Sequence, residues 1–150
     1  MSGPAIDFLG KRPLNAQQKA ALRAVLIRLL EDHEVSLGVN VCFVDDSEIR
    51  QLNRDYLSHD YATDVVTFPM RTEGKPVEGD PLDGDLLGEV VVSVDTARTA
   101  AHSRGVDYPV ELALYAIHGA LHLLGYDDKD AAGRRKMRRA ERIYLDSFLP

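Results

Sequence analysis

The 150-residue chain contains a single cysteine, Cys42, and no tryptophan. One cysteine excludes an internal disulfide and any zinc cluster built from several cysteines, and it agrees with a reducing compartment. Cys42 also has no histidine partner in a motif, which argues against a nucleophilic role. If the chain binds a metal ion, histidine and carboxylate side chains must therefore supply the ligands.

Long apolar runs are also missing. The longest, at residues 110–117 and 121–124, are shorter than the ~20 residues that a membrane-spanning helix needs. The first seven residues have neither the basic nor the apolar region of a secretion signal. We therefore expect a cytoplasmic protein that does not enter a membrane.

The chain has no excess of positive charge. Its 18 basic and 24 acidic residues give a net charge of −6, which argues against a protein that binds nucleic acid over its whole surface. Basic residues nevertheless crowd one segment near the C-terminus, namely Arg134, Arg135, Lys136, Arg138, Arg139 and Arg142. This segment is interpreted either as a solvated helix face or as a patch that faces phosphate groups.

Length and composition predict one domain, residues 1–150, because 45% hydrophobic and 28% charged residues are typical of a globular chain of this size. Helix signals include a capping box at Asn15 and Gln18, a second start at Asp45, and Asp95 as the cap of a third helix. Pro109 suits the first turn of a fourth helix, which Gly125 ends. The expected helices are residues 16–31, 45–56, 95–103, 110–124 and 129–146.

Strand patterns lie between these helices. Apolar residues alternate over residues 35–43, and residues 64–68 and 87–94 are rich in valine. The near-continuous apolar run at 87–94 indicates a central strand, and a long irregular connection is expected around residues 74–84. We predict an α+β fold in which a small mixed sheet packs against helices. The helix at 110–124, apolar on almost every side, is expected to be the central buried helix.

Residues 118–128 carry the most informative motif. His118 and His122 are four apart on the predicted central helix, so their imidazoles can reach the same point. Gly125 can turn the chain back towards that point, which makes Asp128 the expected third metal ligand. Three protein ligands leave a tetrahedral ion one open position for water, as in catalytic zinc sites. Asp127 is the alternative ligand, or an outer-shell group or general base.

A zinc peptidase is the first class of enzyme to test, because the spacing from the histidines to the third ligand matches an extended metalloprotease motif. Such enzymes place glutamate directly after the first histidine as the general base. Gly119 occupies that position here. A peptidase would need its general base from another part of the chain, which makes this class of enzyme a weaker candidate.

The same residues resemble the YbeY endoribonuclease family of ribosomal-RNA maturation factors. The family signature is His-Gly-x-Leu-His-Leu-x-Gly-Tyr-Asp-His, and this chain matches ten of its eleven elements. Asp128 stands where the family has its third metal-binding histidine. The resemblance therefore implies a metal site of His118, His122 and Asp128, with one zinc ion per chain. A carboxylate ligand also allows another, harder divalent ion.

A second segment, residues 52–69, also resembles the family, as does the Leu87-Gly88-Glu89-Val90 strand. Within the segment, Leu57 replaces an arginine that the family is thought to use on RNA phosphate, and Ala62 replaces a proline. Arg54, one helical turn before Leu57, is the expected substitute, with Arg71 as another candidate.

The resemblance implies an endoribonuclease specific for single-stranded RNA that acts in small-subunit ribosomal RNA maturation and associates with ribosomal components. Arg134, Arg135 and Arg138 are expected to bind the RNA backbone. The alternative is a ribosome-assembly or RNA-binding factor without cleavage activity, in which a metal only fixes the Gly125 turn. The remaining histidines, His33, His59 and His102, are interpreted as surface or capping residues.

Overall fold

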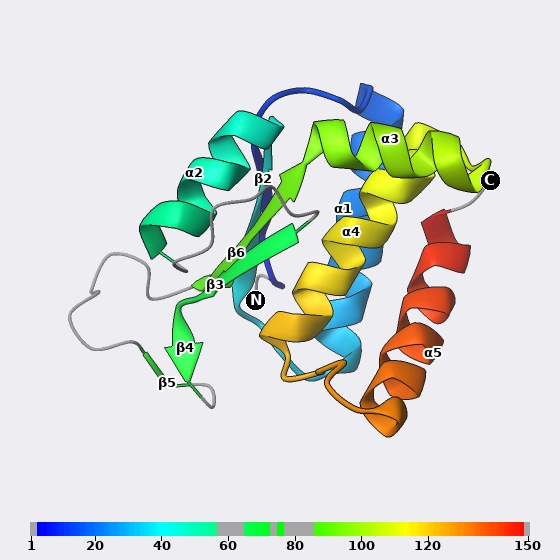
Figure 1. The fold of residues 1–150 in the computed structure, drawn as a ribbon. Helices are drawn as coiled ribbons and strands as arrows, with labels where there is room; N and C mark the ends of the chain where they lie inside the picture. The colour runs from blue at the N-terminus through cyan, green and yellow to red at the C-terminus, as the bar shows by residue number, and fades with distance from the viewer. Residues whose placement is uncertain (1–2, 57–64, 73–74, 77–85, 149–150) are drawn as a thin grey trace.

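The computed structural model describes residues 3–56, 65–72, 75–76 and 86–148 (Figure 1). Its helices are α1 (Ala16–Asp32), α2 (Asp46–Tyr56), α3 (Val94–Arg104), α4 (Tyr108–Leu123) and α5 (Ala131–Phe148). Its strands are β1 (Ile6–Gly10), β2 (Gly38–Val44), β3 (Val65–Pro69), β4 (Arg71–Thr72), β5 (Lys75–Pro76) and β6 (Leu86–Ser93). The expected α+β class is confirmed, as are all five predicted helices and the three predicted strands.

The main sheet is mixed and has the strand order β1-β2-β6-β3. The strands β1, β2 and β6 run parallel, whereas β3 pairs antiparallel with β6. Val90 of β6 lies between Val41 of β2 and Thr67 of β3. The prediction that residues 87–94 form a central strand is therefore confirmed, and the valines of β6 are almost completely buried.

The two faces of the sheet have different partners (Figure 1). On one face, α1 and α4 pack on the sheet and α5 packs on both of them, which gives the larger core cluster. On the other face, α2 covers a smaller cluster of Val44, Ile49, Val66 and Val91. The core is thus built around α4, as its apolar sequence predicted.

Helix caps explain most element boundaries. Asn15 and Gln18 form the expected capping box at the start of α1, and Asp45 with Glu48 forms a second one before α2. The cap predicted for α3 is wrong, because Ser93 rather than Asp95 accepts the hydrogen bond from the Thr96 amide.

Asp95 has a different partner, since its Oδ2 accepts a hydrogen bond from the Asp46 amide at 2.9 Å. The carboxylate therefore joins the start of α3 to the start of α2.

The strand expected at residues 35–43 begins later, at Gly38. The Val35 amide donates to the Leu30 carbonyl at 2.9 Å, so this residue takes part in the hydrogen bonding that closes the C-terminal end of α1 and is not yet in the sheet. Glu34 before it has a positive φ of 60°. The alternation of apolar residues therefore begins three residues before the strand itself, which starts at Gly38.

Two features lay outside the sequence prediction. The edge strand β1 is one, and the short antiparallel ribbon of β4 and β5 is the other. Most of the irregular connection predicted at residues 74–84 lies outside the described residues, as do Leu57, His59 and Ala62. Among the helices that the structure describes, none is both long and apolar enough to cross a membrane.

Candidate metal site

The last two turns of α4 present the two motif histidines side by side. The ring centroids of His118 and His122 are 4.5 Å apart with an interplanar angle of 83°, and their Nε2 atoms are 3.0 Å apart. Gly119 between them lets α4 approach the sheet, because a Cβ atom at this position would lie 2.4 Å from Cγ1 of Val90. The helix therefore rests on β6 through its glycine while the histidines remain partly exposed.

Gly125 turns the chain after α4, as the sequence predicted. Its φ is 100°, its amide donates to the His122 carbonyl, and the Tyr126 amide donates to the Leu121 carbonyl. The turn brings Asp128 back to the helix end, where its Oδ2 lies 3.8 Å from Nε2 of His118 and 3.9 Å from Nε2 of His122. The three ligand atoms lie within 4.8 Å of one another.

These separations are compatible with one shared metal ion. Tetrahedral zinc with bonds of about 2.0–2.2 Å spaces its ligand atoms by about 3.3–3.5 Å, close to the 3.0, 3.8 and 3.9 Å found here. Both histidine side chains are 28% exposed and Asp128 is 48% exposed, so a substrate can reach the group from solvent.

Hydrogen bonds behind the rings fix which nitrogens carry protons. Nδ1 of His122 contacts the Tyr126 carbonyl oxygen at 3.0 Å, and Nδ1 of His118 contacts the Glu141 carboxylate. Both partners are acceptors, so Nδ1 donates in each ring and Nε2 of each neutral ring carries a lone pair. With Nδ1 donating in each ring, the two Nε2 atoms, 3.0 Å apart, can both donate a lone pair to one shared cation. The donor set therefore fits a metal ion.

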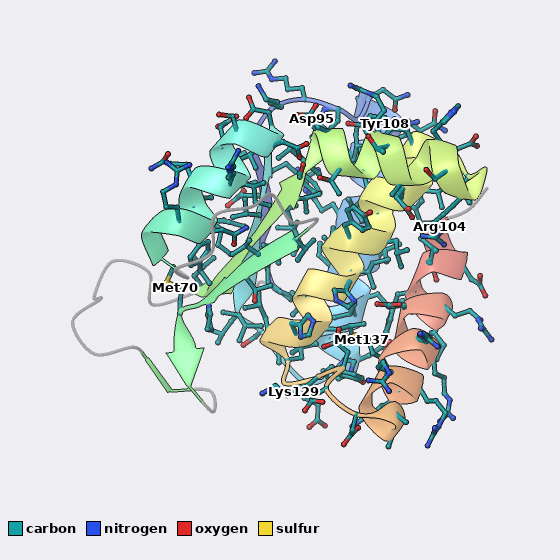
Figure 2. All side chains as sticks on the ribbon, viewed as in Figure 1. Met70, Asp95, Arg104, Tyr108, Lys129 and Met137 are labelled. Carbon is teal, nitrogen blue, oxygen red and sulfur yellow. The ribbon has the colours of Figure 1, made fainter. Side chains whose placement is uncertain are left out.

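The structure brings Asp128, and not Asp127, to the two histidines. Oδ1 of Asp127 instead accepts a hydrogen bond from the Lys129 amide at 3.3 Å. Arg134 also contacts this loop, because its Nη1 lies 3.4 Å from the Asp128 carbonyl oxygen and 3.5 Å from that of Lys129. In Figure 2, Lys129 marks this loop and Met137 marks the adjoining helix α5.

The other predicted site residues are spread more widely. Arg54 lies on α2, which covers the opposite face of the sheet from α4, and its Nη1 donates to Oε1 of Gln51 at 3.4 Å. Arg135 and Arg138 are exposed on α5. The spacing of an α-helix places Arg134, Arg138 and Glu141 along one side of α5, so this edge of the basic segment adjoins the His118 contact.

Sequence reasoning missed Glu141 and the contacts of His33. Glu141 is the only acidic residue between Arg134 and Arg142, and this isolation was the available signal. His33 is the C-cap of α1, as one of its two interpretations held, but its ring also contacts Tyr126. His102 is exposed in the last turn of α3, which confirms its interpretation as a surface residue.

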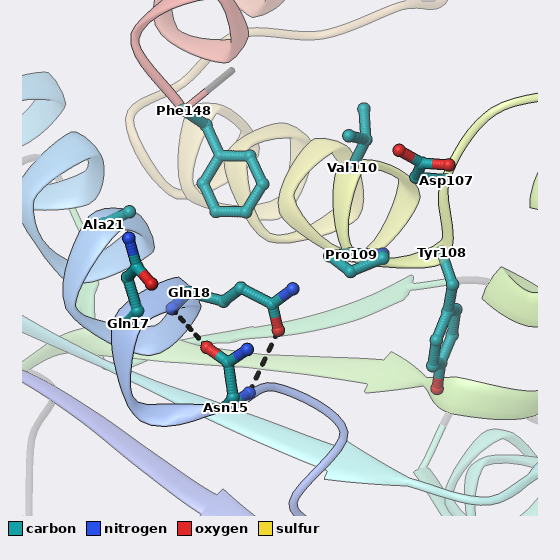
Figure 3. Close-up of a pocket in the computed structure, with 9 residues that line it drawn as sticks. All are labelled: Asn15, Gln17, Gln18, Ala21, Asp107, Tyr108, Pro109, Val110 and Phe148. Carbon is teal, nitrogen blue, oxygen red and sulfur yellow. Dashed lines mark hydrogen bonds between the residues drawn. The ribbon is translucent and has the colours of Figure 1, made fainter. Parts of the chain in front are cut away.

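A cavity of about 620 Å³ lies at the other end of α4 (Figure 3). The start of α1, the start of α4 and Phe148 at the end of α5 surround it. Figure 3 shows the Asn15–Gln18 capping box at its rim. Its lining comes from the first turn of α4, whereas the histidines occupy the last two turns, so this cavity is separate from the metal site.

Comparison with known proteins shows which family the fold and motif belong to. The sequence model of the family described as "Endoribonuclease YbeY" matches residues 9–149. An endoribonuclease YbeY of Salinibacter ruber is 37% identical over 139 residues, which cover 92% of this chain and 88% of that protein. One from Desulfitobacterium hafniense is 45% identical over 119 residues, which cover 79% of this chain and 73% of the relative.

A solved structure is similar as well. The solution structure of TM1509 from Thermotoga maritima matches with a TM-score of 0.70 and 27% identity, over 96% of this chain and 89% of that one. The family match spans nearly the whole chain, including the histidine helix, the turn and α5. The chain therefore belongs to the endoribonuclease YbeY family.

Proposed function

We propose that the protein is a metal-dependent endoribonuclease that cleaves single-stranded ribosomal RNA during maturation of the small subunit and assembly of the ribosome. In this proposal one zinc ion is held by His118, His122 and Asp128. The observation that carries it is the approach of the two Nε2 atoms to 3.0 Å, with Oδ2 of Asp128 3.8 and 3.9 Å from them. Family membership supports RNA as the substrate.

The side chains have separate roles in this proposal. His118 and His122 would bind the ion through Nε2, while their Nδ1–H groups donate hydrogen bonds to the Glu141 carboxylate and the Tyr126 carbonyl oxygen and so hold the rings in orientation. Bound zinc supplies Lewis-acid chemistry, which lowers the pKa of a water ligand and polarises a phosphoryl oxygen. Asp127, next to the third ligand and exposed to solvent, acts as the general base.

The arginines have the task of binding phosphate. Arg134, Arg135 and Arg138 bind the RNA backbone from α5. Arg54, on the opposite side of the sheet from α4, contacts phosphate farther along the RNA strand in place of the arginine that Leu57 replaces. The basic segment of α5 begins at Arg134, four residues after the loop residue Asp130, so an RNA strand bound along it passes close to the metal site. Ribosomal RNA and ribosomal components are the proposed partners.

The test begins with metal content, measured by mass spectrometry on protein purified without a histidine tag. We expect about one zinc ion per chain, and we expect His122→Ala and Asp128→Ala to remove it while the chain stays folded. His118→Ala should then abolish cleavage of single-stranded RNA and leave RNA binding largely intact. A folded wild-type chain that refuses zinc, nickel and manganese would instead favour the non-catalytic ribosome-assembly factor.

A further inference from the structure

Glu141 connects the last helix of the fold to the first metal ligand. Its carboxylate Oε2 contacts Nδ1 of His118, which lies 23 residues earlier on α4. The Glu141 side chain is 16% exposed, less than the 28% of the histidine that it contacts. Although arginines occupy positions 138, 139 and 142, the carboxylate reaches across to the histidine.

The packing of α5 directs this contact. Met137, Ala140 and Tyr144 on the same helix are buried against the core. Glu141 follows Ala140 directly and lies one turn from both Met137 and Tyr144. Glu141 therefore lies at the edge of the α4–α5 interface. The buried neighbours on α5 fix the position of its backbone, and so restrict where its carboxylate can lie.

We propose that Glu141 is a positioning residue of the metal site, which fixes the His118 ring with its proton on Nδ1 and its lone pair on Nε2 directed at the ion. This inference rests on the proposed function, since it concerns how the same site holds its metal. The negative charge behind the ring also makes the imidazole a stronger ligand. The corresponding acceptor for Nδ1 of His122 is the main-chain carbonyl of Tyr126, which no substitution of a side chain removes. Of the two acceptors, only the Glu141 carboxylate can be removed by substitution.

The contact also links metal binding to the docking of α5 on α4. If the Glu141–His118 hydrogen bond favours the metal-bound site, bound metal favours the same hydrogen bond to the same extent, because such coupling is reciprocal. Zinc should therefore stabilise the wild-type fold more than it stabilises a chain in which Glu141 is replaced.

Zinc affinity of the full-length chain tests the proposal, measured by competition with a chromophoric chelator. We expect Glu141→Ala to bind zinc about 10-fold to 100-fold more weakly than wild type. Glu141→Gln keeps an acceptor oxygen and should lose less. Asp146→Ala removes an exposed carboxylate from the same helix and serves as the matched control, with wild-type affinity expected.

The outcomes separate this inference from the proposed function. If wild type binds zinc and the affinities of Glu141→Ala and Glu141→Gln equal that of wild type, the positioning role is overturned and the zinc site stands. If folded wild type binds no zinc, both proposals fail. If Glu141→Ala does not fold, Glu141→Gln decides, since an unchanged affinity overturns the inference and a reduced one supports it.

A second readout does not depend on zinc. Nitrogen-15 NMR of the metal-free chain reports which ring nitrogen of each histidine carries the proton. We expect His118 to hold its proton on Nδ1 in wild type and to shift towards the Nε2-protonated form in Glu141→Ala, while His122 stays unchanged. The same His118 tautomer in both chains would overturn the positioning role.

Discussion

The Tyr126 hydroxyl donates a hydrogen bond to Nε2 of His33, 93 residues away in sequence, at 2.8 Å. Nδ1 of His33 donates in turn to the Leu29 carbonyl at 2.7 Å, which anchors the ring to the end of α1. The main-chain carbonyl of the same tyrosine accepts from His122. Tyr126, which orients the proposed metal ligand His122, is therefore hydrogen-bonded to the end of α1 through His33.

Loss of this anchor should lower stability. We expect Tyr126→Phe to reduce the free energy of unfolding of the metal-free chain by about 1 kcal/mol, because it removes one partly buried hydrogen bond. Urea unfolding measures the change. Tyr108→Phe is the matched control, since among the described residues the Tyr108 hydroxyl is buried without a hydrogen-bond partner and its removal should cost little. Equal losses in the two variants would contradict the role of the anchor.

Close packing of α4 on the sheet gives a second prediction. The Cβ atom that Gly119→Ala adds would lie 2.4 Å from Cγ1 of Val90, so either the helix or the strand must shift. We expect the substitution to lower the free energy of unfolding by about 1–3 kcal/mol, as overpacked cores do.

A double-mutant cycle with Val90→Ala identifies the cause. Val90→Ala alone should destabilise the chain by leaving a cavity, yet it should make Gly119→Ala less harmful because the clashing atoms are gone. Additive effects of the two substitutions would show that the strain arises elsewhere.

Alkaline pH gives a third prediction. Burial, followed by the hydrogen bond and charge of Asp32, raises the pKa of Tyr144 from 10.0 to about 12. The unfolded chain then loses this proton before the folded chain does, so the free energy of unfolding falls as pH rises from 10.0 towards 12. Below pH 10.0 the stabilisation of the neutral hydroxyl is fully present.

Denaturant unfolding at a series of alkaline pH values measures this slope. Tyr144→Phe lacks the ionisable group and should show a flatter dependence than wild type, even though it also loses the hydrogen bond to Asp32 at neutral pH. Burial also raises the pKa values of Cys42 and Tyr108, so part of the slope should persist in the variant. An identical slope in both chains would refute the assignment to Tyr144.

The basic segment of α5 gives a fourth prediction, which depends on the proposed function. For a cleavage-resistant 2′-O-methyl RNA strand, the logarithm of the binding constant should fall linearly with the logarithm of the salt concentration. Replacement of Arg135 or Arg138 by alanine should each reduce that slope by about 0.7, the value for one contact to a single-stranded backbone. Lys19→Ala, at the start of α1, is the control and should leave the slope unchanged. Slopes unaffected by either arginine would mark this segment as a solvated helix face.

Arg134 should behave differently from its neighbours. Its guanidinium contacts the carbonyl oxygens of Asp128 and Lys129, which lie in the loop of the third ligand. Replacement by alanine is therefore expected to disturb zinc binding as well as the salt slope, whereas Arg135→Ala should affect only the slope.

Local patterns predicted most of the fold, because helix caps and apolar periodicity act within a few residues. The capping box at Asn15 and the buried run of β6 are examples in which local preference and tertiary packing agree. The strand β1 escaped prediction because it is a five-residue edge strand whose identity depends on pairing with β2. Ser93 is the cap of α3, whereas Asp95, inside the first turn, accepts from the Asp46 amide of α2, a long-range contact that local patterns do not reveal.

The same division applies to the metal site. The spacing of His118, His122 and Asp128 was sufficient to predict that they meet, since one helix and one glycine turn determine it. Glu141 and His33 could not be predicted in this way. Their contacts cross between helices, so they exist only after α1 and α5 have packed around α4.

The glycine contact between α4 and β6 also limits how this scaffold can change its chemistry. A zinc peptidase with the same spacing of histidines carries a glutamate at this position as its general base. In this fold, however, the side chain at position 119 would point into Val90 and not towards a substrate. The packing of α4 on β6 therefore opposes the glutamate that a zinc peptidase carries after its first histidine, so that Gly119→Glu would act as a folding defect and would not add a general base.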